Sequence, residues 1–319
     1  MVAKYSDDEF ITAWKRLGTP ELVSKALGLN LRGVYKRREN IEAKHGIVLD
    51  SVTTNGARRP QSKVPKEGYR AITQNITGHV IVGSDLHAWP GDRSIAFDAF
   101  IKTIKKLKPS LIVMNGDSFD GARVSRHAPG GYAQLPEVAD ELSAVQELHG
   151  EIENAAPDGC PLIWCAGNHD NRFSSRLAIA APEFMRVKGF DIADHFESWQ
   201  FTWSLWINGH TVIKHRWHQG LHGAYNNTLK SGKNIITGHT HRMQAIQFAD
   251  YNGLRWGIEC GTLGVWQTTD DKSSWAEDNP ANHSQGFVIL TFDDDGTLLE
   301  PEFCRVMNGK AWFRGKAIA

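Results

Sequence analysis

The segment HVIVGSDLH, residues 79–87, is an apolar run that leads directly into aspartate and histidine side chains. The next apolar run, LIVMNGD at residues 111–117, ends in a similar way. Between them, residues 95–107 carry apolar side chains at the spacing of an amphipathic helix. A strand, a helix and a second strand in this order predict a βαβ unit, whose parallel strands end at one edge of a sheet. We therefore expect an α/β fold with ligands at that edge.

Three further apolar runs lead into turns that contain histidine. These runs are LIWCAGNHD at 162–170, TVIKH at 211–215 and NIITGHTH at 234–241. Another helix is predicted at residues 136–155, and two later strands, at 254–260 and 287–292, are expected to form a second sheet. A chain of 319 residues is long enough for one large α/β domain and one small domain.

Five predicted strands in this chain are followed directly by histidine, aspartate or asparagine. A lone histidine after a strand is usually structural, but five such ends together indicate a metal centre. Imidazole, carboxylate and amide ligands without a thiolate suit Mn²⁺, Fe²⁺, Zn²⁺ or Ni²⁺, and of these we expect Mn²⁺. The number of such side chains exceeds what one ion requires, so the sequence predicts two divalent metal ions.

Taken in order, these motifs resemble the calcineurin-like metallophosphoesterase family, which includes nucleases, purple acid phosphatases and bacterial phosphodiesterases. The resemblance covers roughly residues 78–300, and it implies a four-layer αββα sandwich. The ligands that it implies are Asp85, His87 and His241 for one ion, Asn168, His215 and His239 for the other, and Asp117 as the bridge.

The resemblance also implies how the reaction is catalysed. His169 matches the catalytic histidine, Asp170 is expected behind it as an orienting carboxylate, and Asp120 matches a position that supports the ligands. Two metal ions lower the pKa of a shared water from ~15.7 toward neutrality, so a bridging hydroxide is the expected nucleophile. His169 would then donate a proton to the leaving oxygen.

The fourth motif departs from the family pattern, because His215 is followed by Arg216 where glycine is common. His215 ends its strand and is the expected ligand. His218 is the alternative, and either histidine could instead contact the substrate.

Several loop residues are candidates for binding a substrate phosphate. They are Arg123, Arg126 and His127 after the bridging aspartate, and Arg172 after the catalytic histidine. Each could neutralise a phosphate, or could be a solvated surface side chain. Exposed tryptophans, Trp217 among them, could stack on bases, although most aromatic residues belong to a core.

The N-terminal region is basic and has a helical pattern. Residues 1–70 contain 14 Lys and Arg against 8 Asp and Glu, a net charge of +6, whereas the remainder has 22 against 28, a net charge of −6. Three short helices are predicted, at 7–17, from Thr19 to Gly28, and from Asn30 to Gly46.

In the third predicted helix, Leu31, Val34, Tyr35 and Ile41 are expected to face inward. This arrangement resembles a helix-turn-helix, whose second helix enters the DNA major groove. The outward residues that would contact DNA are Arg32, Lys36 and Arg37. A module that binds a protein partner or a second copy of the chain is the alternative.

The sequence therefore predicts a helical module at 1–49, a linker at 50–77 and a metallophosphoesterase domain at 78–319. No apolar stretch approaches the ~18 residues of a membrane span, and no signal peptide is evident, so we expect a cytoplasmic location. Its four cysteines form no CxxC pair and are expected to be reduced thiols.

The functions that remain differ in substrate. The basic module favours a DNA phosphodiesterase or nuclease, a layout typical of phage or mobile-element proteins. A phosphatase or cyclic-nucleotide phosphodiesterase, whose helices bind a protein partner, is the alternative. A DNA-binding protein with an inactive metal domain is the third possibility.

Overall fold

The structure is a computed structural model. It describes residues 5–49, 70–127, 133–184, 187–265 and 282–319. The chain divides into two compact units, Met1–Pro65 and Lys66–Ala319. Within the described ranges, no helix has the length and apolar character that crossing a bilayer requires.

The first unit is a three-helix module. Its helices are α1 Asp7–Leu17, α2 Pro20–Leu27 and α3 Leu31–His45. Side chains cap each helix, since Ser6, Thr19 and Asn30 all accept a hydrogen bond from a backbone N–H in the first turn. The three helices therefore lie at the predicted residues. The buried side chains of the module are Phe10, Trp14, Val23, Val34, Ile41 and Leu49.

The buried face of α3 is narrower than the sequence predicted. Val34 is buried as expected, but Leu31 is 40% exposed and Tyr35 is 45% exposed. The prediction that these two residues face inward was wrong, because α3 buries the side that carries Val34 and Ile41, and Leu31 and Tyr35 lie one turn apart on the stripe beside it. Arg32 and Lys36 are exposed, as a DNA-contacting face requires.

Arg37 does not project freely from α3, in contrast to the prediction. Its Nη2 donates to the carbonyl of Tyr5 and lies 3.6 Å from the carboxylate of Asp7. Its guanidinium lies 5.5 Å from the centre of the Phe10 ring. A long cationic side chain at the edge of a buried face can cover an aromatic ring in this way. Arg37 therefore stabilises the module, and Arg32 and Lys36 remain the candidates for DNA contact.

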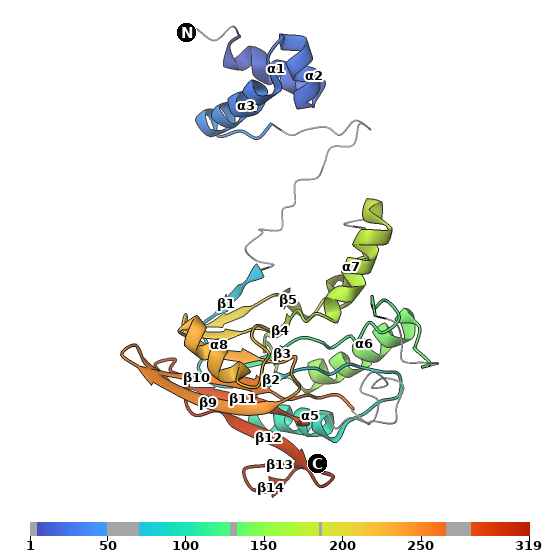
Figure 1. Cartoon of the computed structure of the whole chain (residues 1–319), viewed down its shortest axis with the longest axis vertical. Helices are drawn as coiled ribbons and strands as arrows, with labels where there is room; N and C mark the ends of the chain where they lie inside the picture. The colour runs from blue at the N-terminus through green and yellow to red at the C-terminus, as the bar shows by residue number, and fades with distance from the viewer. Residues whose placement is uncertain (1–4, 50–69, 128–132, 185–186, 266–281) are drawn as a thin grey trace. The chain divides into compact units, whose positions relative to one another are not determined.

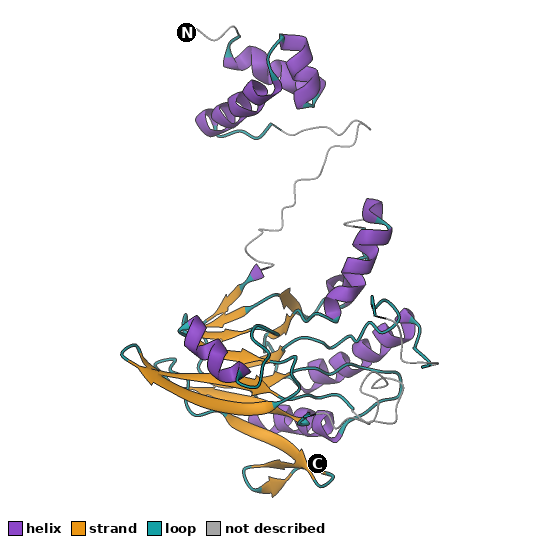
Figure 2. Cartoon of the chain, in the orientation of Figure 1, coloured by secondary structure: helices purple, strands orange, loops and turns teal. Residues whose placement is uncertain are grey.

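The second unit contains two sheets in its described residues (Figures 1 and 2). The larger sheet has the order β14-β13-β12-β11-β2-β3-β4-β5. Its strands are β2 Gly78–Gly83, β3 Leu111–Met114, β4 Leu162–Cys165, β5 Gln200–Thr202, β11 Gly286–Phe292, β12 Glu302–Met307, β13 Lys310–Phe313 and β14 Lys316–Ala317. β2 to β5 are parallel, and the strands from β11 to β14 continue the sheet in antiparallel pairs.

The smaller sheet has the order β1-β6-β7-β8-β10-β9. Its strands are β1 Ile72–Gln74, β6 Leu205–Ile207, β7 Thr211–Ile213, β8 Asn234–Thr237, β9 Met243–Asp250 and β10 Gly253–Cys260. β7 and β8 are parallel neighbours, so their carboxyl ends lie together.

Helices cover the outer faces of both sheets. α5 Ile95–Leu107 and α6 Val138–Ala155 pack on the larger sheet, and α8 Gly223–Ser231 packs on β8, β9 and β10 of the smaller one. Apolar side chains of alternating strand positions, such as Val80 and Ile236, fill the space between the sheets. The predicted four-layer αββα sandwich is therefore confirmed. The other helices of the described residues are α7 Asp170–Ala180 and two short 3₁₀ helices, Pro182–Phe184 and Ile192–His195.

Two predictions about the sheets were wrong. Residues 287–292 were expected in a second sheet, but β11 pairs with β2 and so belongs to the larger sheet. The predicted linker at 50–77 includes β1, which pairs with β6. Residues 50–69 of that linker lie outside the described residues.

Candidate metal centre

The loops that follow the strands are joined by backbone hydrogen bonds. The N–H of Asp85 donates to the carbonyl of Gly116 at 2.9 Å, and the N–H of His87 donates to the carbonyl of Asp117 at 2.9 Å. The ladder between β2 and β3 thus continues into the loops. The side chains after these two strands are brought together as the βαβ unit predicted.

Five of the predicted metal ligands have left-handed backbone conformations. Their φ angles are 53° for Asp85, 42° for His87, 52° for Asp117, 69° for His239 and 54° for His241. Each such residue costs about 1 to 2 kcal/mol relative to the right-handed region. Strain of this kind persists only where the surrounding structure enforces it, and it concentrates at functional sites.

Two glycines are required by close packing around the ligands. A Cβ atom on Gly167 would lie 2.0 Å from Oδ1 of Asp117, and one on Gly116 would lie 2.4 Å from the ring of His215. Because these contacts are shorter than any real Cβ contact, any larger residue would displace a ligand. Glycine is therefore required at both positions, because it leaves room for the side chains of Asp117 and His215.

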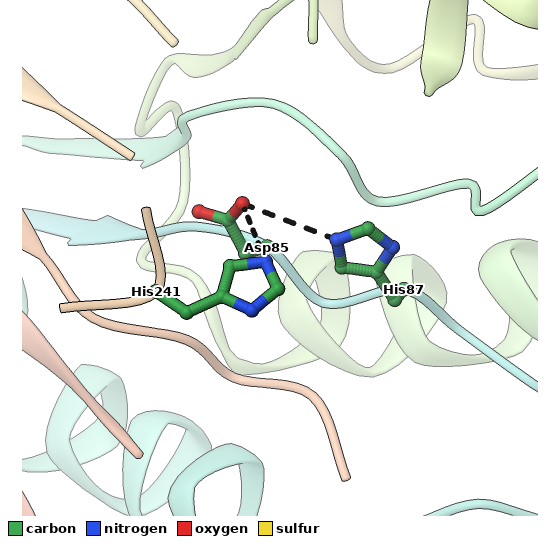
Figure 3. Close-up of side chains that lie close together, drawn as sticks. All are labelled: Asp85, His87 and His241. Carbon is green, nitrogen blue, oxygen red and sulfur yellow. Dashed lines mark ion pairs between the residues drawn. The ribbon is translucent and has the colours of Figure 1, made fainter. Parts of the chain in front are cut away.

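Asp85, His87 and His241 form the first cluster of possible ligands (Figure 3). Oδ1 of Asp85 lies 3.1 Å from Nε2 of His241 and 3.9 Å from Nε2 of His87. Two ligands that are each about 2.1 Å from one ion lie about 3.0 to 3.4 Å apart at angles of about 90° to 109°. The cluster is buried and has nearly the spacing that a shared ion requires.

The second cluster consists of Asp117, His215 and His239. Oδ2 of Asp117 lies 3.0 Å from Nε2 of His215. The same oxygen lies 3.9 Å from Nε2 of His87, so Asp117 faces both clusters, as a bridging ligand must. Oδ1 of Asn168 is buried and has no hydrogen-bond partner among the described residues, which suits a metal ligand.

The tautomer of His215 tests whether a cation fits. Its Nδ1 lies 2.8 Å from the carbonyl oxygen of Asn115, and a carbonyl can only accept, so Nδ1 carries a proton. Nε2 of the neutral ring then directs a lone pair toward the carboxylate of Asp117, without the geometry of a hydrogen bond. Two electron-rich atoms so close together require a positive charge between them, which is a metal ion when one is bound and otherwise the proton that the raised pKa of this ring allows. The donor set therefore fits a divalent ion.

The charges in the clusters shift the pKa values strongly. Burial opposes the charged form of His215, but the carboxylates of Asp117 and Asp85 outweigh it and raise its pKa to about 9. Burial also opposes the ionisation of Asp85, yet His241 and His215 lower its pKa to about 2. The acids thus stay ionised and retain cations near them, which is the electrostatic condition for binding metal.

His169 lies beside both clusters and is oriented by Asp120. Its Nδ1 lies 2.9 Å from the carbonyl and 3.0 Å from Oδ1 of Asp120, while its Nε2 lies 4.0 Å from Oδ2 of Asp117. Nη2 of Arg172 approaches the same Nε2 at 3.1 Å. His169 therefore presents Nε2 toward the metal centre, where a catalytic acid is expected.

Asp170 has a different role from the one predicted. Its buried carboxylate accepts hydrogen bonds from the backbone N–H groups of Asp117, Gly167 and Phe119, and from Nε1 of Trp164. The carboxylate that orients His169 is that of Asp120, because Asp170 begins α7 and points back under the loop of Asp117. Asp170 thus fixes the backbone of Asp117.

The predicted phosphate-binding residues lie in different environments. Arg172 is at the centre, and its Nη1 also donates to the carbonyl of Asp120 at 2.8 Å. Arg123 instead donates to the carbonyls of residues 135 and 136 and pairs with Glu137. Arg126 and His127 are exposed, and their contact with substrate stays a prediction.

Sequence reasoning missed two groups near the centre. His283 contacts the predicted ligand His241, with their Nδ1 atoms 3.4 Å apart, although no motif surrounds it. Glu141 on α6 is fully buried and accepts a hydrogen bond from the N–H of Gly121. Only the position of Glu141 on the apolar face of its helix could have indicated burial.

Comparisons with known proteins agree with this geometry. Residues 78–243 match the sequence model of a family described as calcineurin-like phosphoesterase, a range that includes all the predicted metal ligands. The gene 54 protein of Mycobacterium phage L5 is 24% identical over 254 residues, which cover 74% of this chain and 96% of the phage protein.

Solved structures with similar folds are more distant. Vps29 complexed with Zn²⁺, from Entamoeba histolytica, is 12% identical with a TM-score of 0.41, and the match covers 75% of this chain and 98% of that chain. Yfce, a phosphoesterase from E. coli, is 16% identical with a TM-score of 0.32 over 70% of this chain and 97% of that one.

Proposed function

This chain belongs to the calcineurin-like phosphoesterase family, as a metal-dependent phosphoesterase with a site for two divalent ions, and we propose that its substrate is DNA. The observation that carries the reaction class is Asp117, whose Oδ2 faces ligands of both clusters. The DNA substrate is supported by the N-terminal module, in which Arg32 and Lys36 are exposed on α3. Lys and Arg side chains on one helix face can neutralise DNA phosphates.

The side chains around the ions have separable roles in this proposal. When bound, the ions would supply an activated water and polarise the phosphoryl oxygens. His169 keeps a proton on Nδ1 against Asp120, so a second proton on Nε2 can pass to the leaving oxygen. Arg172 donates toward that Nε2 at 3.1 Å, so Nε2 can take up its proton once the guanidinium turns its N–H groups to a phosphate oxygen of the entering substrate.

We further propose Mn²⁺ as the working ion. The two clusters combine imidazole and carboxylate, with an amide oxygen beside them, which suits a borderline or hard divalent ion. Activity after removal of metal and return of Mn²⁺, Mg²⁺, Zn²⁺ or Ni²⁺ in turn would rank the ions.

The proposed function is tested with a panel of substrates in the presence of Mn²⁺. Plasmid DNA, single-stranded DNA, a phosphate monoester and cyclic nucleotides are compared for the wild type and His169→Ala. We expect cleavage of DNA that falls about 10²- to 10⁴-fold in the variant, which lacks the proposed general acid. Intact DNA at every enzyme concentration would contradict the DNA substrate.

A second function is favoured by one observation on the N-terminal module. Leu22 and Leu31 are 48% and 40% exposed, and Tyr35 is 45% exposed, so the module has apolar side chains that a protein partner could cover. A phosphatase or cyclic-nucleotide phosphodiesterase that docks through this module is the alternative. Turnover of those esters while DNA stays intact would support it.

A further inference from the structure

Trp217 is an exposed aromatic side chain two residues beyond the cluster residue His215. It is 42% exposed. The ring of His218 stacks against it, with 5.0 Å between ring centres and 30° between ring planes. We call Trp217 and His218 the aromatic platform. A rigid aromatic surface beside a phosphoesterase centre is suited to stacking on a base.

Hydrogen bonds from Asn227 and Arg242 hold the backbone of the loop that carries the platform. The N–H of His218 donates to Oδ1 of Asn227 at 2.9 Å, and the Asn227 amide donates back to the His218 carbonyl at 3.1 Å. Nη2 of Arg242 donates to the carbonyls of Gln219 and Gly220 at 3.1 and 2.8 Å. Because the loop is already ordered, a ligand that stacks there loses little affinity to ordering it.

Glu259 connects this loop to the turn that carries two metal ligands. Its carboxylate is fully buried and lies 3.1 Å from Nη2 of Arg242. The hydroxyl of Thr240, between His239 and His241, donates to the same carboxylate at 2.8 Å. The position of the platform relative to the metal centre is therefore fixed by a buried hydrogen-bond network.

Positive charge surrounds the platform. Nζ of Lys214 lies 5.9 Å from the centre of the Trp217 ring. Arg216, which lies between His215 and Trp217 in the sequence, is exposed. An aromatic surface flanked by cations suits a ligand that combines a base with phosphates.

We propose that the aromatic platform binds one unpaired base next to the scissile phosphate, so that the enzyme acts on single-stranded or frayed nucleic acid. A base within a duplex is paired and stacked, and it cannot reach the platform without leaving the helix. This inference rests on the phosphodiesterase function proposed above, and it adds which form of nucleic acid enters the centre.

The test compares two inhibitors of bis(p-nitrophenyl) phosphate hydrolysis by the full-length protein with Mn²⁺. Thymidine 5′-monophosphate carries a base, and 2-deoxyribose 5-phosphate has the same sugar phosphate without one. We expect the base to lower the inhibition constant about 5- to 150-fold in the wild type, the range of one stacked base. Trp217→Ala should abolish this ratio, and Trp217→Phe should retain most of it. Trp312→Ala, at a tryptophan of β13 that is 38% exposed, is the matched control and should leave it unchanged.

A second arm uses one oligonucleotide sequence as a single strand and as a duplex. The single strand should inhibit more strongly in the wild type, and Trp217→Ala should remove the difference. The proposal is overturned if the effect of the base or the preference for the single strand persists in Trp217→Ala. It is also overturned if the wild type shows neither.

Failure of the platform is distinguishable from failure of the proposed function. If bis(p-nitrophenyl) phosphate and DNA are not hydrolysed at all, the phosphodiesterase function is wrong. Calorimetric titration with thymidine 5′-monophosphate then decides the platform by itself. Equal affinity of the wild type and Trp217→Ala would overturn it, and weaker binding by Trp217→Ala alone would support it.

Discussion

Asp120 contacts two histidines of the centre with one carboxylate oxygen. Its Oδ1 lies 2.6 Å from Nδ1 of His87 and 3.0 Å from Nδ1 of His169. Each ring therefore keeps its Nδ1 proton toward Asp120 and turns Nε2 toward the clusters. One buried carboxylate thus couples the orientation of a metal ligand to that of the proposed acid.

Replacing Asp120 should weaken both metal binding by His87 and proton donation by His169. Asp120→Ala is expected to lower turnover or metal affinity about 10- to 100-fold, as loss of a ligand's hydrogen-bond partner does. Asp120→Asn keeps an acceptor but removes the charge that helps to raise the pKa of His169. Since the proposed acid is lost as pH rises through that pKa, the alkaline limb of the rate profile should move to lower pH.

The control for this prediction is Asp158→Asn, at an exposed aspartate. It should leave both metal affinity and the pH profile unchanged. An Asp120→Asn profile that coincides with that of the wild type would show that Asp120 does not act through His169.

His215 and His218 can be separated by counting metal ions. His215 lies in the second cluster with Asp117 and His239, whereas His218 stacks on Trp217. His215→Ala should lower the metal content of the dialysed protein from about two ions per chain to about one, because an ion needs several protein ligands. His218→Ala should keep both ions. Elemental analysis that shows the opposite pattern would make His218 the ligand.

The ligand clusters were predictable because each ligand follows a strand end, and parallel strands place those ends together. The carboxylate that orients His169 was not predictable. Asp170 is the neighbour of His169 in the sequence, but the carboxylate in contact with its ring is that of Asp120. His283 reaches His241 from a remote segment that no spacing rule connects to it. Contacts made through the tertiary fold alone leave no pattern in the sequence.

At the scale of elements, helix α6 buries a carboxyl group against the loop of the bridging aspartate. Burial and the charge of Asp120 raise the pKa of Glu141 to about 8. This folded-state pKa exceeds the ordinary value of 4.5. The contribution of the protonated Glu141 to the free energy of unfolding is therefore fully present below about pH 4.5, and it is lost as pH rises through about 8. Wild-type stability should therefore decline between these pH values, by at most about 1.4 kcal/mol per pH unit from this group.

Glu141→Gln should flatten that decline, because glutamine does not titrate. The measurement is urea unfolding at several pH values. Glu147→Gln, at an exposed position of the same helix, should keep the wild-type slope. Identical slopes for wild type and Glu141→Gln would show that Glu141 is ionised throughout.

Elements with strong local signals were predicted well, and those defined by pairing were not. α5 begins and ends at the predicted residues, Ile95 and Leu107, since its apolar spacing and the cap at Ser94 are local. β1 spans only Ile72–Gln74 and depends on pairing with β6. β11 was assigned to the wrong sheet, because an apolar run indicates a strand but does not reveal its neighbours.

At the scale of the whole molecule, the chain combines two units with opposite charge balance. The basic residues 1–70 mostly belong to the unit Met1–Pro65, whereas the acidic remainder contains the predicted metal ligands. Two compact units with separate cores can divide the work of binding and catalysis. We therefore expect DNA affinity and ester hydrolysis to respond independently to changes in the first unit.

Deleting residues 1–65 should change DNA binding but not the chemistry of a small ester. The full chain should lose DNA affinity steeply with salt, because each neutralised phosphate releases counterions. The truncated protein should show a flatter dependence of log affinity on log salt, with hydrolysis of bis(p-nitrophenyl) phosphate unchanged. Fluorescence anisotropy of labelled DNA across a salt series measures the slope.

Point variants of the full chain make this prediction specific to α3. Arg32→Ala and Lys36→Ala should each reduce the salt slope by about 1 if each residue contacts one phosphate. Lys25→Ala, at an exposed lysine of α2, should leave the slope unchanged. Equal slopes for the full and truncated chains would assign DNA binding to the metal-binding unit and leave the exposed apolar side chains of the module to a protein partner.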